Sequence, residues 1–161
     1  MMIFFEILAV IFALSYLYLA MEQNIACWYA AFFSTSIYIF LYWDVSLYME
    51  SLLNFYYLGM AVYGWRQWRN GSKEKHKSIT IWSVNKHILI ISLIILLSFS
   101  SGYFLSHSDA VRPYLDSFTT WASVITTYMV TQKILSNWLY WIVINSVGIF
   151  LNLDRELYLT V

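Results

Sequence analysis

Residues 44–48 read Asp-Val-Ser-Leu-Tyr, and residues 154–158, which lie 110 positions later, read Asp-Arg-Glu-Leu-Tyr. The same ungapped offset pairs further identical residues, namely Trp28 with Trp138, Ser36 with Ser146, Phe40 with Phe150, and Leu41 with Leu151. Upstream it pairs Glu6 with Asp116 and Tyr18 with Tyr128. Internal repeats in helical membrane proteins are typical of secondary transporters, in which the solute site lies where the two halves face each other. The repeat therefore favours a carrier.

The composition of the 161-residue chain indicates a membrane protein. Hydrophobic residues make up 61% of it and charged residues only 11%. Nine acidic and nine basic residues cannot give a soluble domain of this length a charged surface, so a lipid bilayer is the better solvent. The single cysteine, Cys27, excludes an intrachain disulfide and a cysteine metal cluster. The first twenty residues contain no Lys or Arg, so we expect a retained first helix rather than a signal peptide.

Six apolar stretches approach the ~20 residues that a helix needs to cross a bilayer. They lie at about residues 2–21, 27–44, 51–68, 87–107, 113–132 and 138–154. Because lipid offers no hydrogen-bond partner to a free backbone N–H or C=O, the spans must be helical. The sequence therefore predicts an all-α membrane protein, folded as a polytopic helical bundle.

The repeat divides this bundle into segments. Residues 1–68 are expected to form the first three-helix repeat, 69–86 a basic loop, 87–107 a linker transmembrane helix, and 113–161 the second repeat. At the observed offset, a complete second repeat would extend to about residue 178. The third helix of the second repeat is therefore expected to be missing from this chain.

Lysine and arginine are distributed unevenly between the two sides of the predicted bundle. One side carries seven of them: Arg66, Arg69, Lys73, Lys75, Lys77, Lys86 and Lys133. The other side carries two, Arg112 and Arg155. Since positive residues accumulate on the cytoplasmic side, the 69–86 loop is predicted to be cytoplasmic and the N-terminus to lie outside. This loop lacks the aromatic or structured context of a nucleic-acid patch, so we expect no nucleic-acid partner.

Two indoles and an amide share one helix face near the end of the chain. Trp138, Trp141 and Asn145 are spaced three and then four residues apart. Asn145 lies about two turns into its span, where an unpaired amide is costly. A flat ligand could stack on the indoles, and a cationic ring would gain a further cation–π term of roughly 0.5–2 kcal/mol. The alternative is an asparagine that bridges two helices, worth about 0.6 kcal/mol, and the spacing does not decide between them.

Aromatic residues also end the third span, which closes with Tyr63-Gly64-Trp65-Arg66-Gln67-Trp68. The functional interpretation is an aromatic wall at the inner mouth of a solute site. Tryptophan and arginine at a span end are also routine interface anchors, and composition favours that second interpretation.

Enzyme chemistry has little support in the sequence. The three histidines, His76, His87 and His107, form no metal-ligand pair at helical spacing. The chain has no nucleophile elbow, no zinc-protease motif and no phosphate-binding glycine loop. We therefore expect no catalytic residues, no metal and no cofactor.

The chain resembles the PnuC family of bacterial vitamin transporters. Three features carry the resemblance: the Y-G-W-x-Q-W end of the third span (Tyr63, Gly64, Trp65, Gln67, Trp68), the W-x-x-W-x-x-x-N face (Trp138, Trp141, Asn145), and Leu157-Tyr158-Leu159-Thr160 before the last helix. It covers essentially the whole chain. It implies a 3+1+3 helix fold similar to the SWEET sugar carriers, and a multi-pass location in the bacterial inner membrane.

The resemblance also implies facilitated diffusion of nicotinamide riboside, a precursor of NAD, without an ion gradient or ATP. It implies that Trp138, Trp141 and Asn145 contact the ligand, with the indoles packing its pyridinium ring. The other expected binding residues are Trp65, Tyr63 and Gln67. Two alternatives remain: a carrier of thiamine or another vitamin from the same family, and a small non-transport membrane protein or subunit. The lipid bilayer is an expected partner, and a homo-oligomer is left open.

Overall fold

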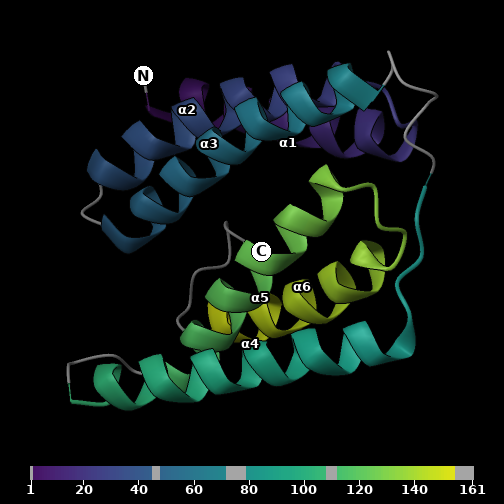
Figure 1. The fold of residues 1–161 in the computed structure, drawn as a ribbon. Helices are drawn as coiled ribbons and strands as arrows, with labels where there is room; N and C mark the ends of the chain where they lie inside the picture. The colour runs from purple at the N-terminus through teal and green to yellow at the C-terminus, as the bar shows by residue number, and fades with distance from the viewer. Residues whose placement is uncertain (1, 45–47, 72–78, 108–111, 155–161) are drawn as a thin grey trace. The chain divides into compact units, whose positions relative to one another are not determined.

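A computed structural model describes residues 2–44, 48–71, 79–107 and 112–154 (Figure 1). These segments form six helices: α1 Met2–Met21, α2 Cys27–Asp44, α3 Tyr48–Gly71, α4 Val84–Leu105, α5 Pro113–Thr131 and α6 Asn137–Asp154. Within the described segments the only β pairing is an isolated bridge between Thr80 and Ile134. The all-α class predicted from the sequence is confirmed.

The helix bounds follow the predicted spans closely and differ mainly around the basic loop. Helix α3 continues to Gly71, where Arg69 in its last turn complements the negative end of the helix dipole. Helix α4 begins at Val84, after an extended Ser83 at the N-cap position. Both ends of the predicted 69–86 loop are therefore helical.

Some predicted features lie outside the described residues. They are the charges Lys73, Lys75, Lys77 and Arg155, the residue His76, and the segment 157–160.

The chain divides into two compact units, Met1–Ser78 and Ile79–Val161. In the first unit α2 packs against both α1 and α3, and in the second unit α5 packs against both α4 and α6. Helix α4, predicted to be a linker, thus packs within the second unit. The assignment of residues to repeats and a linker stays a prediction.

The turn between α1 and α2 has the same backbone as the turn between α5 and α6. Gln23 and Lys133, 110 positions apart, both have a positive φ, 54° and 55°. In each turn the next residue donates its N–H to a carbonyl five positions back, from Asn24 to Leu19 (2.9 Å) and from Ile134 to Met129 (3.1 Å). This is the hydrogen-bonding pattern of a Schellman helix end. The shared turn supports the predicted offset of 110.

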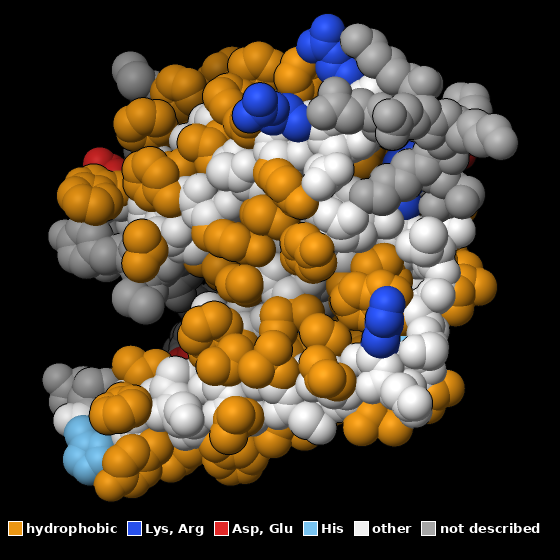
Figure 2. Space-filling model, viewed as in Figure 1, with side chains coloured by type: hydrophobic (Ala, Val, Ile, Leu, Met, Phe, Trp, Pro, Cys, Tyr) orange, Lys and Arg blue, Asp and Glu red, His pale blue; other side chains and the backbone are white. Residues whose placement is uncertain are grey.

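Helices α1 and α4 are long and apolar enough to cross a membrane. Most of their side chains are exposed, including Leu14 (61%) and Phe104 (76%). Figure 2 shows hydrophobic side chains spread over much of the visible face. Exposed apolar surface of this extent is unfavourable in water and favourable in lipid. This surface is typical of a membrane protein.

In the first unit, α2 and α3 approach each other closely around Trp28. The Trp28 side chain is 3% exposed and meets the Trp68 ring edge to face at 5.4 Å. A Cβ built on Gly64 would lie 2.6 Å from Cε2 of Trp28, so only glycine leaves room for the indole there. The buried Trp28 N–H has no hydrogen-bond partner among the described residues. Trp28 therefore holds these helices together by packing.

In the second unit, most of the buried side chains of α5 are small. They include Ser117, Ala122, Ser123, Thr126 and Thr127, beside the larger Met129 and Val130. Small residues let helix backbones approach closely where lipid provides no hydrophobic force between helices. Ala122 joins Ile94 of α4 and Ile144 of α6 in one core cluster.

Two glycines of α3 provide a matched test of this packing. We expect Gly64→Ala to lower the free energy of unfolding by about 1–3 kcal/mol, because the added methyl group displaces Trp28. Gly59→Ala should raise it by about 0.5–1 kcal/mol, because no atom lies within 4 Å of the added Cβ and alanine is the better helix former. Unfolding of the purified protein in mixed micelles measures both. Equal changes in the free energy of unfolding for Gly64→Ala and Gly59→Ala would contradict the close contact between Gly64 and Trp28.

Candidate functional site

Three of the predicted site residues lie together on α6. Trp138, Trp141 and Asn145 share one face of this helix, as their spacing requires. Trp138 and Trp141 are half-buried and Asn145 is exposed. Trp141 also packs against the core cluster of the second unit. Its indole is thus packed on one side while part of it remains exposed.

The Asn145 side chain lies in the middle of the 18-residue helix α6. No hydrogen bond joins its amide to another residue in the described part of the chain. An amide at this depth in a membrane is costly unless it finds a polar partner. Asn145 thus offers an unused donor and acceptor beside two indoles.

A hydrogen-bonded cluster holds the opposite side of α6. The His87 Nδ1 lies 2.9 Å from the Tyr140 hydroxyl, and its Nε2 lies 3.3 Å from the Ser136 hydroxyl. This cluster connects α4 to the first turn of α6 and so fixes the rotation of α6. Sequence reasoning assigned no role to His87, because a partner 53 residues away leaves no local pattern.

The backbone before α4 is bonded to the turn that precedes α6. Thr80 donates its N–H to the Lys133 carbonyl at 3.0 Å and accepts the Leu135 N–H at 3.0 Å. These two bonds, together with the His87 cluster, fix the entry to α6 at two places. The aromatic face of α6 is therefore presented by a rigid support.

The other three predicted site residues lie on α3, on different sides of that helix. Gln67 donates its side-chain N–H to the Tyr63 hydroxyl at 2.6 Å. Trp65 instead donates its indole N–H to the Tyr29 hydroxyl of α2 at 2.9 Å. Successive helix residues are rotated by about 100°, so Trp65 cannot share a face with Tyr63. The residues of the expected aromatic wall therefore lie on two sides of α3, with Tyr63 and Gln67 apart from Trp65.

A groove between α2 and α3 surrounds Trp65. Its volume is about 250 Å³, and its lining comprises Trp28, Tyr29, Phe32, Ala61, Val62 and Trp65. The guanidinium carbon of Arg69 lies 4.9 Å from the centre of the Trp65 ring. Sequence reasoning missed both Tyr29 and Arg69 here. The Trp65–Arg69 spacing of four residues was the available signal for the second, whereas nothing local indicates Tyr29.

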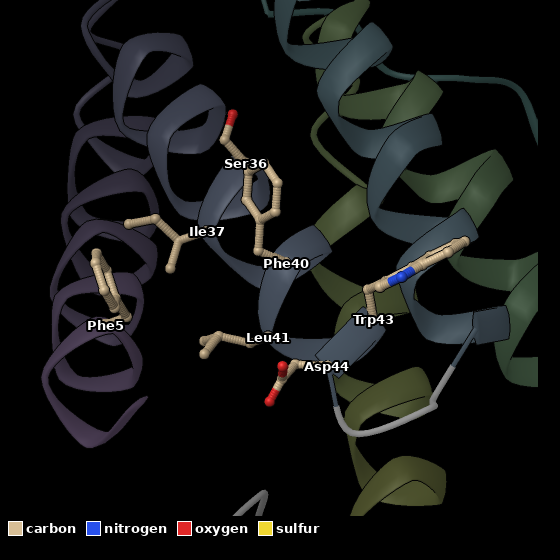
Figure 3. Close-up of a pocket in the computed structure, with 7 residues that line it drawn as sticks. All are labelled: Phe5, Ser36, Ile37, Phe40, Leu41, Trp43 and Asp44. Atoms are coloured by element: carbon tan, nitrogen blue, oxygen red, sulfur yellow. The ribbon is translucent and has the colours of Figure 1, made fainter. Parts of the chain in front are cut away.

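A larger apolar groove of about 540 Å³ lies between α1 and α2 (Figure 3). It is lined by Phe5, Ser36, Ile37, Phe40, Leu41, Trp43 and Asp44, and includes none of the predicted site residues. Phe40 is 75% exposed and Trp43 is 62% exposed. Side chains this exposed on membrane helices suit contact with lipid better than an enclosed ligand site.

The comparisons with known proteins agree with the fold. A profile of the family described as "Nicotinamide mononucleotide transporter" matches residues 3–161. The chain is also similar to a solved structure described as "Crystal structure of the Vitamin B3 transporter PnuC", with a TM-score of 0.67 and 18% sequence identity. The match covers 92% of this chain and 74% of that chain. At this identity the likeness shows the fold.

The family profile covers nearly all of the chain and describes a transporter, so the protein is not an enzyme. It also leaves the alternative of a non-transport membrane subunit without support. The resemblance to the PnuC family is confirmed at the level of the family. The chain belongs to the nicotinamide mononucleotide transporter family.

Proposed function

We propose that this protein carries nicotinamide riboside across the bacterial inner membrane. The observation that supports this most strongly is the α6 face, where Trp138 and Trp141 stand beside the unpaired amide of Asn145. The riboside has a flat, cationic pyridinium ring with a carboxamide. Indoles attract such a ring by about 0.5–2 kcal/mol. Asn145 can pair with the ligand carboxamide, since an amide offers both donor and acceptor.

The riboside fits the α6 face better than the phosphorylated mononucleotide. Proteins bind phosphate with Arg, Lys or the first N–H groups of a helix. Between Trp138 and Asn145 the α6 sequence contains no charged residue. Burying a phosphate there without a cation would be unfavourable. A thiamine carrier is less well supported, because both comparisons are named for nicotinamide or vitamin B3 compounds.

Transport is proposed to proceed by facilitated diffusion with alternating access. Proton coupling in transporters uses ionisable residues in the middle of the membrane. The acidic residues of the described helices all occupy positions near a helix end: Glu6, Asp44, Glu50, Asp116 and Asp154. The charge distribution therefore favours uncoupled movement of the riboside down its gradient.

Uptake into proteoliposomes tests this proposal. We expect labelled nicotinamide riboside to enter when ionophores have dissipated proton and sodium gradients, because the described helices carry no acidic residue near the middle of the membrane. Excess unlabelled riboside should suppress the uptake, whereas excess thiamine should not. Liposomes without protein are the control. Uptake that collapses without an ion gradient, or that thiamine blocks equally well, would rule out this proposal.

Replacing Trp141 tests the stacking role. We expect Trp141→Ala to abolish calorimetric binding of the riboside. Because this indole also packs on the core, Trp141→Leu is the sharper variant: it keeps an apolar side chain and removes the aromatic face. Trp141→Leu should weaken binding of the riboside by at least about 0.5–2 kcal/mol, the contribution of one cation–π contact. Trp43→Leu, the same change at an exposed residue of α2, should leave binding unchanged. Undiminished binding in a folded Trp141→Leu protein would exclude stacking.

A further inference from the structure

A cation already lies over the Trp65 ring. The Arg69 guanidinium lies 4.9 Å from the ring centre, one helical turn further along α3. The Tyr29 hydroxyl accepts the Trp65 indole N–H at 2.9 Å, and the Tyr29 and Trp65 rings meet edge to face at 6.3 Å. Trp65 is therefore fixed in orientation, with Arg69 placed where an aromatic face attracts positive charge.

The surrounding groove suits one flat ring. Four aromatic residues line it, Trp28, Tyr29, Phe32 and Trp65, in a volume of about 250 Å³. None of the described residues that line it carries a carboxylate, so their attraction for a cation comes from the ring faces. A neutral ring can pack against the apolar walls while Arg69 stays in place. A cationic ring needs the position over Trp65 that Arg69 occupies, because two positive charges repel each other there.

We propose that the α2–α3 groove is a second, weaker station for the nicotinamide ring, and that Arg69 is its charge-selectivity residue, because the Arg69 guanidinium competes with the cationic ring for Trp65. This inference rests on the proposed function, in which a pyridinium cation is the substrate. Arg69 is exposed and lies in the last turn of α3. Binding of the cationic ring over Trp65 requires the Arg69 guanidinium to move off that ring.

The competition has a use in transport. A carrier must bind its solute well enough to capture it and weakly enough to release it, and two stations of unequal strength meet both needs. Arg69 lies on the side predicted to be cytoplasmic. When the guanidinium returns to Trp65, it displaces the cationic riboside and so lowers the affinity of the groove for the riboside. Neutral rings can still bind there.

A matched pair of arginines allows a test. Arg66 is also exposed, lies on the same helix three residues earlier, and makes no cation–π contact among the described residues. R69Q and R66Q remove the same charge from the same end of α3. Any effect of the general electrostatic field should appear in both variants, whereas competition for Trp65 should appear only in R69Q.

The experiment is fluorine NMR of the full chain labelled with 5-fluorotryptophan, with the Trp65 and Trp141 signals assigned by their loss in Trp65→Phe and Trp141→Leu. The ligands are nicotinamide riboside and its neutral, reduced dihydropyridine form. In R69Q we expect the Trp65 signal to respond to the riboside at about two- to fivefold lower concentration than in the unmodified protein. In R66Q the Trp65 signal should respond to the riboside at the same concentration as in the unmodified protein. The reduced riboside should act at the same concentration in the unmodified protein, R66Q and R69Q.

The outcomes separate the two proposals. A Trp65 signal that ignores the riboside in every variant, or equal changes in R66Q and R69Q, would overturn the inference about Arg69. An equal gain for the reduced riboside in R69Q would overturn it as well. A Trp141 signal that ignores the riboside would contradict the proposed function instead. The remaining tryptophan signals report whether each variant is folded.

Discussion

Backbone hydrogen bonding in lipid is the constraint on which the rest of this structure depends. The hydrocarbon core offers no partner to a free N–H or C=O, so the apolar stretches of the described chain satisfy their own backbone as helices. The same constraint applies where helices end. The α1–α2 and α5–α6 turns satisfy their last carbonyls with the same bonds, around Gln23 and Lys133. Helix ends are thus completed locally, and the helices can pack by shape.

Packing by shape explains where side chains can be used for function. Glycine and small residues leave room where helices pack, as Gly64 does beneath Trp28 and Ala122 does in the core cluster of the second unit. Trp28 and Trp138 are paired by the 110-residue offset, yet Trp28 is buried and Trp138 is only half-buried. The same helix position therefore serves packing in the first unit and offers an aromatic surface in the second.

Much of this fold could be predicted because its signals are local. Continuous apolar stretches fix the helices to within a few residues, and spacing alone places Trp138, Trp141 and Asn145 on one face. The candidate site could be predicted less well. The hydrogen bonds from Trp65 to Tyr29 and from His87 to Tyr140 join residues 36 and 53 positions apart. Sequence periodicity cannot predict pairs at such separations. Tyr63 and Trp65 are neighbours in a motif, but helical rotation separates them in space.

The two tryptophans with the clearest functional interpretation differ in what already surrounds them. Trp141 packs on an apolar core beside the unpaired amide of Asn145, whereas Trp65 lies under Arg69. An uncharged face with two indoles should prefer a cationic ring that carries no phosphate. Calorimetric titration of the purified protein with nicotinamide riboside and with nicotinamide mononucleotide tests this most directly. The account predicts saturable binding of the riboside. The mononucleotide should bind with an affinity at least about tenfold lower. Equal or tighter binding of the mononucleotide would contradict it.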